Sequence, residues 1–160
     1  MNSPAQLALQ QAHGTCLAHY QALREALDDL KLRELKSTDL ESLTKEDRRL
    51  LDQFAYRYTR LQDDMGARLI TTVLTALGEE IAAMPVLDRL DRLEQLGWLP
   101  SAEEWVELRR TRNEFTHEYP ETIQERFERL QLALAAAERV ITILEAMNQR
   151  IYQRFPGIKA

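Results

Sequence analysis

Apolar residues recur every three or four positions along most of this chain, a spacing that places side chains on one face of an α-helix. The first such series precedes a polar stretch at residues 36–39. It consists of Tyr20, Leu23, Leu27 and Leu30. The pattern therefore predicts a first helix that ends at the polar stretch.

A longer apolar stripe predicts a second helix of about 35 residues. Thr44 precedes it, with the acid Asp47 three positions later, an arrangement typical of a helix N-terminus. The stripe continues through Gly66, which is a weak point because glycine disfavours helix. Met84-Pro85 is expected to end the helix. The stripe consists of Leu50, Phe54, Tyr58, Leu61, Met65, Leu69 and Val73.

Two shorter helices are expected before the last segment. The first ends near Gly97, since glycine readily adopts the left-handed conformation that follows many helices. The second begins at Ser101, with Glu104 forming a capping box. It finishes near Tyr119, because Pro120 disfavours a helical conformation in the residue before it. The apolar positions of the first are Leu87, Leu90 and Leu93.

The last segment has the most regular pattern, with apolar spacings that alternate between four and three residues up to Phe155. That average is typical of the seam of a bundle or coiled coil, and incomplete charge patterning around 132–137 favours a bundle core. Further apolar residues lie off the seam, so this helix is either central to its own bundle or partly covered by a second subunit. These off-seam residues are Leu132, Ala136, Val140 and Met147.

The expected helices fit one all-α domain over residues 1–160, an antiparallel up-and-down bundle of four helices with a short extra helix. The composition agrees, because 5 glycines and 5 prolines leave few turn residues for a β-fold. With 44% hydrophobic and 29% charged residues, the chain is typical of a soluble globular protein. A net charge of −5 disfavours a surface that is basic all round, but permits a local basic patch.

The sequence indicates a cytoplasmic protein without membrane segments. No apolar run approaches the roughly 18–20 residues of a membrane helix, and the first residues lack the pattern of a signal peptide. The single cysteine, Cys16, suits a reducing compartment. His13, Cys16 and His19 have a spacing that invites a zinc site, but on a helix His19 is about 240° round from His13. A buried small cysteine is the favoured interpretation, with no metal and no cofactor.

Candidate chemistry is concentrated in the helix predicted for 101–119. Arg112 lies in the middle of an apolar stripe, so its guanidinium must reach solvent, pair with a carboxylate or face a ligand. Asp63 or Asp64 is a plausible carboxylate partner for Arg112 or for Arg60. Asn113 and His117 are one turn apart on an adjacent face. The stripe consists of Trp105, Leu108, Phe115 and Tyr119.

Residues 112–119, which read R-N-E-F-T-H-E-Y, resemble the R-N-x-x-x-H-x-Y signature of the HEPN superfamily. The likeness is strongest to the HepT-like toxins, which are encoded beside a minimal nucleotidyltransferase. The segments 96–105 and 58–66 are also similar, as is the order of five helices. The resemblance covers most of the chain.

The resemblance implies a metal-independent ribonuclease that works as a homodimer, with the motif helices of both subunits lining one cleft. His117 would be the general acid/base for attack of an RNA 2′-hydroxyl on its phosphate, a role that suits imidazole chemistry. Arg112 would hold the scissile phosphate, and Asn113 would orient the ring or the substrate. Arg109 and Arg110 would add positive charge for RNA binding.

In the toxin subgroup the tyrosine that matches Tyr119 is adenylylated by the partner nucleotidyltransferase, which silences the toxin. The alternative for Tyr119 is a core tyrosine that completes the apolar stripe. Two other functions stay open for the whole chain. It is either a non-catalytic nucleotide- or substrate-binding subunit of such a nucleotidyltransferase, or a helical interaction protein in which Arg112 and His117 are structural.

Overall fold

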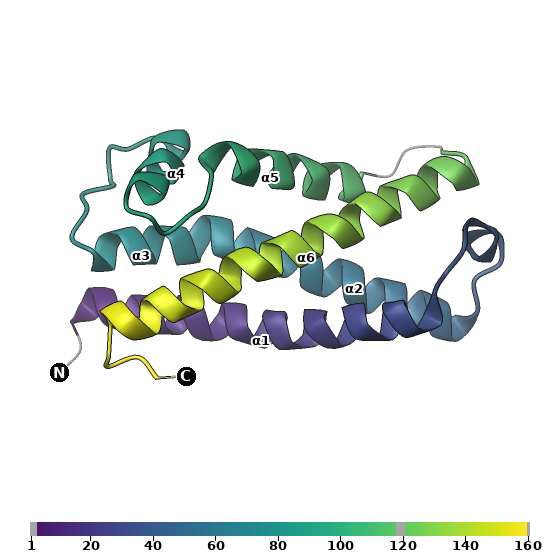
Figure 1. Cartoon of the computed structure of the whole chain (residues 1–160), viewed down its shortest axis with the longest axis horizontal. Coiled ribbons are helices and arrows are strands. Elements are labelled where there is room, and N and C mark those ends of the chain that lie inside the picture. Colours follow the sequence, from purple (N-terminus) through teal and green to yellow (C-terminus); the bar gives the residue numbers. More distant parts are fainter. Residues whose placement is uncertain (1–2, 118–120, 160) are drawn as a thin grey trace.

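The computed structural model describes residues 3–117 and 121–159, and all secondary structure in these ranges is helical. Four long helical rods form a bundle, and one short helix lies at its end (Figure 1). The prediction of an all-α bundle of four helices with a short extra one is confirmed. The elements are α1 (Pro4–Arg33), a 3₁₀ turn (Ser37–Glu41), α2 (Lys45–Asp64), a π-helical turn (Met65–Leu69), α3 (Ile70–Ala76), α4 (Val86–Gln95), α5 (Ala102–Thr116) and α6 (Ile123–Arg154).

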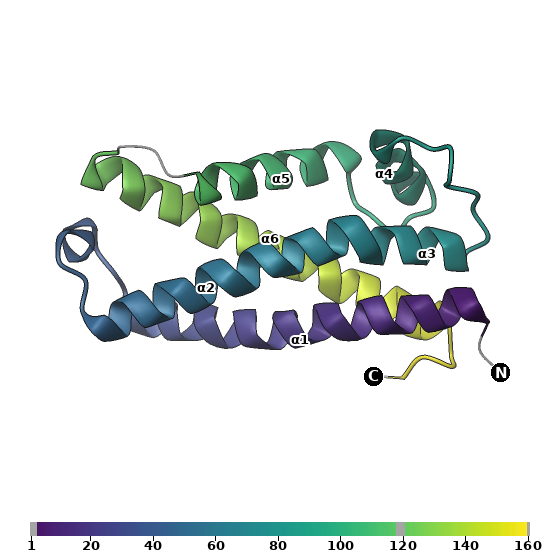
Figure 2. The ribbon, with the colours of Figure 1, turned by 180° about the vertical axis from the view of Figure 1, so that it is seen from behind.

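The rods are arranged so that α6 crosses diagonally over α1 and the α2–α3 rod (Figure 1). Seen from behind, the α2–α3 rod lies in front, with α1 on one side and α5 on the other (Figure 2). Both chain ends lie at the same end of the bundle, near α3 and α4. The short helix α4 connects the α2–α3 rod to α5.

Helix α1 begins earlier than its most regular apolar series indicates. The Ser3 hydroxyl accepts a hydrogen bond from the Gln6 N–H at 3.2 Å, and Pro4 occupies the first turn, where its missing N–H costs nothing. The buried positions of the early turns are Leu9, Ala12, His13 and Cys16. Only Leu9 among them is a large apolar residue, which explains why the sequence pattern indicates only the second half. Glu34 ends the helix in the left-handed conformation, with φ 49°.

The second rod, from α2 to α3, is one continuous helical run. It contains the π-helical turn Met65–Leu69, which we call the wide turn, at its predicted weak point, Gly66. Its apolar stripe advances one turn at each of six steps and moves 23 residues along the chain from Leu50 to Val73. Six regular turns contain only roughly 22 residues. The π-helical turn takes up this surplus, so the stripe stays on one side. The prediction that the helix runs to Met84 is wrong. Gly78, with φ +89°, turns the chain out of the helix first.

Helix α5 begins as predicted but ends early. The Ser101 hydroxyl accepts from the Glu104 N–H at 3.1 Å, whereas the Glu104 carboxylate pairs with Arg139 of α6 at 2.8 Å instead of closing a capping box. The last helical residue is Thr116, because His117 is extended, with φ −74° and ψ 133°. The helix therefore ends somewhat before the expected position near Tyr119.

Helix α6 buries most of its apolar residues within the single chain. Of its off-seam residues, Ala136, Val140 and Met147 are buried within the single chain, whereas Leu132 is 60% exposed. The first alternative stated for this helix, a central position in its own bundle, thus accounts for three of the four residues.

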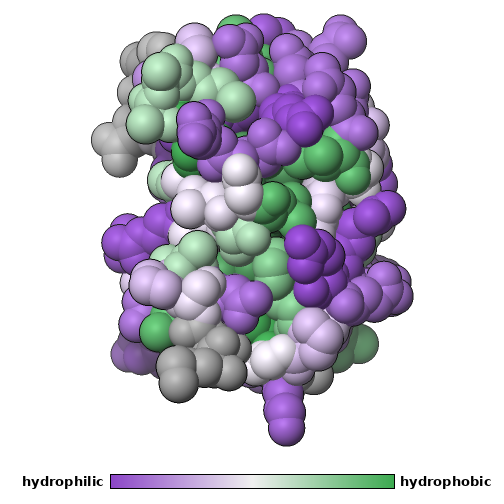
Figure 3. Space-filling model, turned by 90° about the vertical axis from the view of Figure 1, so that its left-hand side faces the viewer, coloured by the Kyte–Doolittle hydropathy of each residue, from purple (hydrophilic) through white to green (hydrophobic). Residues whose placement is uncertain are grey.

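The bundle end that carries α4 and the start of α1 has a mixed surface, with apolar residues set between polar ones (Figure 3). Large exposed apolar side chains in these two elements are Leu7, Val86 and Leu87. In the described part of the chain, no helix has both the length and the apolar character needed to cross a membrane.

Candidate functional site

The apolar stripe of α5 faces α2 and contains one charged residue, Arg112. Trp105 and Leu108 on this stripe are buried, and the Phe115 ring lies 5.7 Å from the ring of Phe54 on α2. The Arg112 side chain is 20% exposed. Its position in the stripe is the predicted one, and a guanidinium there stays charged and needs partners.

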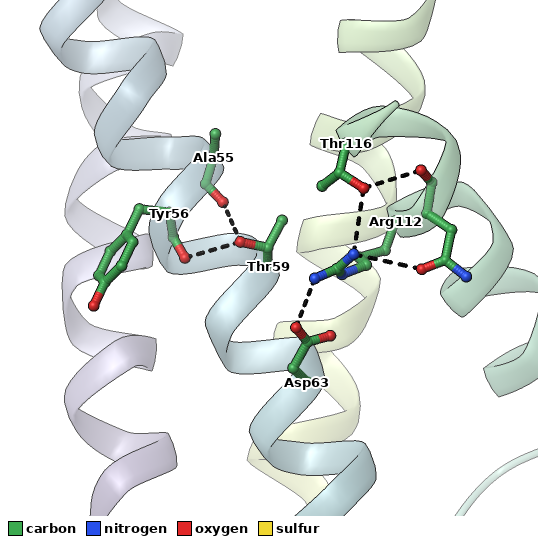
Figure 4. A network of polar contacts seen from close by, with 7 residues as sticks. Ala55, Tyr56, Thr59, Asp63, Arg112 and Thr116 are labelled. Atoms are coloured by element: carbon green, nitrogen blue, oxygen red, sulfur yellow. Dashed lines mark hydrogen bonds and ion pairs between the residues drawn. The ribbon is translucent and has the colours of Figure 1, made fainter. Parts of the chain in front are cut away.

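Arg112 finds its partners on both helices. Its Nη2 donates to Asp63 Oδ2 of α2 at 2.6 Å, while Nη1 donates to Thr116 Oγ1 at 3.3 Å and to Asn113 Oδ1 at 3.5 Å. Figure 4 shows the guanidinium in the gap between α2 and α5, with Asp63 on one side and Thr116 on the other. Of the two carboxylates considered from sequence, Asp63 is the partner. Its side chain is 50% exposed, so solvent and solutes reach the ion pair.

His117 is exposed and lies directly after α5. Arg129 of α6 fixes the backbone at this point, since its Nη1 donates to the His117 carbonyl at 2.5 Å and to that of Glu114 at 3.4 Å. A cation at the C-terminus of a helix satisfies free carbonyls and interacts favourably with the helix dipole. The backbone carrying the imidazole is thus held by α6, beside Thr116, which contacts Arg112.

The remaining predicted site residues lie in different surroundings. Asn113 is exposed, and its side-chain oxygen accepts from Arg112. Arg110 is exposed and pairs with Glu107 on its own helix at 2.9 Å, whereas Arg109 lines a groove beside Arg112. Tyr119, the predicted modification site, lies outside the described residues.

Three polar groups between α2 and α5 are buried and have no hydrogen-bond partner in the part of the chain that the structure describes. They are the Tyr58 hydroxyl, both amide atoms of Gln62, and Nε of Arg112. Tyr58 and Gln62 are one turn apart on α2, with the whole residues 0% and 3% exposed. Burial raises the pKa of Tyr58, against a smaller opposing effect from the charge of Arg112. Most buried polar groups in proteins are hydrogen-bonded, so these three mark an unusual place.

A groove of about 370 Å³ is lined by one of these residues, Gln62, and we call it the Trp105 groove. It runs between the wide turn, α4 and α5, and it shares Asp63 with the Arg112 ion pair. A Cβ added at Gly66 would lie 3.7 Å from the Trp105 ring, in ordinary van der Waals contact with it, and Trp105 itself is 3% exposed. The lining residues are Gln62, Asp63, Gly66, Ala67, Val86, Leu90, Trp105 and Arg109.

The His13, Cys16 and His19 series of α1 is not brought together around a metal. His13 Nε2 lies 2.7 Å from Asn148 Oδ1, and His19 lies 3.3 Å from Asp64. Cys16 is fully buried, and burial raises its pKa to about 12. The interpretation as a buried small cysteine is confirmed. In residues 3–117 and 121–159, no cluster of three or more His, Cys, Asp or Glu is placed to hold a metal ion.

Sequence reasoning missed Gln62, Tyr58 and Arg129 as parts of the site. A signal existed for Gln62, because it is a polar residue beside the apolar stripe of α2, one turn after Tyr58. Arg129 gave no such signal, since its role depends on where α6 crosses α5.

The site described here therefore combines an ion-paired arginine, an exposed histidine held by its backbone, and a groove with unpartnered polar groups. In the comparisons with known proteins, no family model, no curated protein and no solved structure matches this chain.

Proposed function

We infer that this chain is a HEPN-type endoribonuclease, the toxin of a toxin–antitoxin pair, which cuts RNA without a metal ion. The observation that carries the proposal is the placement of Arg112. Its guanidinium lies at the boundary of α2 and α5 and contacts the neighbour of the exposed His117, and its Nε–H has no partner within residues 3–117 and 121–159. A cation beside an imidazole is the minimal equipment for transesterification of RNA.

In the proposed reaction His117 takes the proton from an RNA 2′-hydroxyl. The 2′-oxygen forms a bond to the adjacent phosphorus, the bond from phosphorus to the 5′-oxygen breaks, and the imidazolium returns its proton to that leaving oxygen. Arg112 binds the non-bridging oxygens, whose negative charge increases in the transition state. The products are a 2′,3′-cyclic phosphate and a 5′-hydroxyl, and DNA is not a substrate because it lacks the nucleophile.

The chain is proposed to act as a homodimer in the cytoplasm, with Arg109 and Arg110 adding positive charge along the RNA path. A cognate minimal nucleotidyltransferase would silence it by transferring the adenylyl group of ATP to the Tyr119 hydroxyl, with release of pyrophosphate. The added phosphate would compete with RNA for Arg112. Co-expression with that partner should increase the mass of the wild-type chain by one adenylyl group, and the Tyr119→Phe variant should lack the increase.

The test is cleavage of a long single-stranded RNA by purified protein in the presence of EDTA, with growth after induction followed in parallel. We expect His117→Ala and Arg112→Ala to reduce cleavage by at least about 100-fold, while wild type leaves 2′,3′-cyclic phosphate ends. Arg110→Ala is the matched control, because it removes the same charge from the same helix at a residue already paired with Glu107. Its loss should be only a few-fold. Equal activity of wild type and a folded His117→Ala variant would exclude this function.

A second candidate function is favoured by the 2.6 Å ion pair of Arg112 with Asp63. An arginine already neutralised suits a non-catalytic subunit that binds nucleotide or substrate for a nucleotidyltransferase. In that case purified wild type leaves RNA intact and is harmless to cells, yet it binds ATP in a calorimetric titration.

A further inference from the structure

The Trp105 groove is the cavity next to the proposed phosphate position. The ion pair joins the two, because Asp63 lines the groove and also holds the Arg112 guanidinium. Its volume of about 370 Å³ is at the small end of ligand pockets. One base with part of its ribose fits this space, and a larger ligand would extend outside it.

Gln62 is the residue that indicates a ligand. It is 3% exposed, lines the groove, and neither the oxygen nor the nitrogen of its amide has a hydrogen-bond partner. An unpartnered buried polar group is costly, and a leucine or methionine would suit this position better if it were only a packing site. The π-helical turn also begins three residues later, and such turns are frequent at functional sites.

The groove offers the three kinds of contact that a nucleotide needs. The Gln62 amide presents a donor and an acceptor side by side, which matches the edge of a base, and adenine is the base that such amides pair with most regularly. The Trp105 ring lines the groove beside Gly66, which has no side chain, and provides an apolar wall for a flat ring. Arg109, at the rim, is exposed and has no ion pair among the described residues.

We propose that the Trp105 groove binds one unpaired base of single-stranded RNA, next to the phosphate held by Arg112, and that Gln62 selects adenine there. This inference rests on the proposed ribonuclease function for its substrate, but the groove and its chemistry are independent of His117. A rotation of the Gln62 side chain turns its amide from the groove floor toward the base. Recognition of a splayed-out base by its edge is how proteins usually read single-stranded RNA.

The first experiment compares cleavage of short single-stranded RNAs that each contain one cleavable bond. The RNAs differ only in the base on the 5′ side or on the 3′ side of that bond. Wild type should cut the adenine substrate about tenfold or more faster than the others. The Gln62→Met variant keeps the length of the side chain and removes its amide. It should cut all four substrates at similar rates and unfold at the same or a higher temperature. Wild type without base preference, or Gln62→Met with an unchanged preference, overturns the proposal.

Filling the groove provides a second variant, should Gln62→Met fail to fold. Ala67 is an exposed lining residue, so Ala67→Phe blocks the groove from the surface of the helix. Thr75→Phe is the control, because it places the same ring on an exposed part of α3 outside the groove. We expect Ala67→Phe to lose the adenine preference and Thr75→Phe to keep it. The reverse result overturns the proposal.

A binding experiment separates failure of the groove from failure of the ribonuclease function. AMP, CMP, GMP and UMP are titrated into wild type and into Gln62→Met, and binding is followed by calorimetry. Preferential binding of AMP to wild type that is lost in Gln62→Met supports the groove even if no RNA is cut, and it then removes only the ribonuclease proposal. RNA cleavage without base preference, together with equal or absent binding of the four nucleotides, overturns the groove alone.

Discussion

Two buried polar regions of this bundle differ in whether their polar atoms have hydrogen-bond partners among the described residues. Between α1 and α6, His13 is 2% exposed, and its Nε2 lies 2.7 Å from Asn148 Oδ1. Between α2 and α5, Gln62 is 3% exposed, and its amide has no hydrogen-bond partner among the described residues. Burying polar atoms costs free energy in both regions, but only in the first do hydrogen bonds among the described residues offset this cost.

The difference separates polar groups that stabilise the fold through hydrogen bonds from polar groups that the described residues leave without a partner. Contacts between α1 and α6 repeat along the helices, with Tyr20 donating to Glu145 at 2.8 Å and Arg24 to Glu138 at 3.0 Å. These contacts fix how α6 crosses α1. Between α2 and α5, where Arg112 and the Trp105 groove meet, the Tyr58 hydroxyl and the Gln62 amide make no such contacts with the described residues.

The largest effect is expected from breaking the hydrogen-bonded region between α1 and α6. His13→Ala removes most of a buried ring and leaves the Asn148 oxygen without its partner, so the free energy of unfolding should fall by about 2–3 kcal/mol. His13→Gln, which keeps a donor, should lose less. Urea unfolding measures both. If the free energy of unfolding changes by less than about 0.5 kcal/mol in His13→Ala, the contact between His13 and Asn148 does not stabilise the fold.

The next effect is a dependence of stability on pH. Burial lowers the pKa of His13 and, together with the nearby arginines, that of His19, against smaller raising contacts. The unfolded chain therefore binds protons before the folded one as pH falls below about 6.5. Stability should decline from there until the folded-state pKa values are reached. Urea unfolding at pH 7 and pH 5.5 should show a smaller decline for His13→Gln/His19→Gln, and an equal decline would contradict the assignment.

A smaller effect of opposite sign is expected in the region between α2 and α5. Tyr58→Phe removes a buried hydroxyl that has no partner, so the free energy of unfolding should stay equal or rise by up to about 1 kcal/mol. Tyr56→Phe is the control, since Tyr56 is 52% exposed and its change should be near zero. Thermal unfolding distinguishes the two. A clear loss of stability in Tyr58→Phe would indicate that the hydroxyl binds a buried water.

The smallest effect on stability is expected at the ion pair beside the groove. Asp63 is half exposed, so Asp63→Asn should change the free energy of unfolding by less than about 0.5 kcal/mol. The same change frees the charge of Arg112 for phosphate. RNA binding, measured on the His117→Ala background, should tighten several-fold, and its dependence on salt should steepen by about one ion. Unchanged binding would place Arg112 outside the RNA path.

The fold was largely predictable because apolar spacing alone positions the helices. Ser101 and Gly97 indicated the turn between α4 and α5 correctly, since both act through local backbone chemistry. Residues 37–41 and the early end of the second rod at Gly78 were not predicted. A short polar 3₁₀ turn carries no apolar period, and Met84-Pro85 was a second stop signal that competed with the glycine.

The candidate site was predictable only in part. Arg112 stood out because a charge interrupts an apolar stripe, and that reasoning needs one helix only. Its pairing with Asp63 rather than Asp64 depends on how α2 is rotated against α5, which no single-helix pattern contains. The support of His117 by Arg129 likewise depends on a crossing of two helices far apart in sequence.

The wide turn at Met65–Leu69 gives this protein an uneven tolerance to insertions and deletions. The segment 78–85 joins two helices without belonging to either, so a residue gained or lost there leaves both helices in place. A residue lost from the regular part of α2 instead rotates the side chains on the two sides of the deletion by roughly 100° against each other. A residue lost from the wide turn removes the surplus and restores regular helix, so Ile70 and Val73 stay on the core side. Changes in chain length in related proteins should therefore concentrate in the connection and, as single deletions, in the wide turn, and should avoid the regular part of α2.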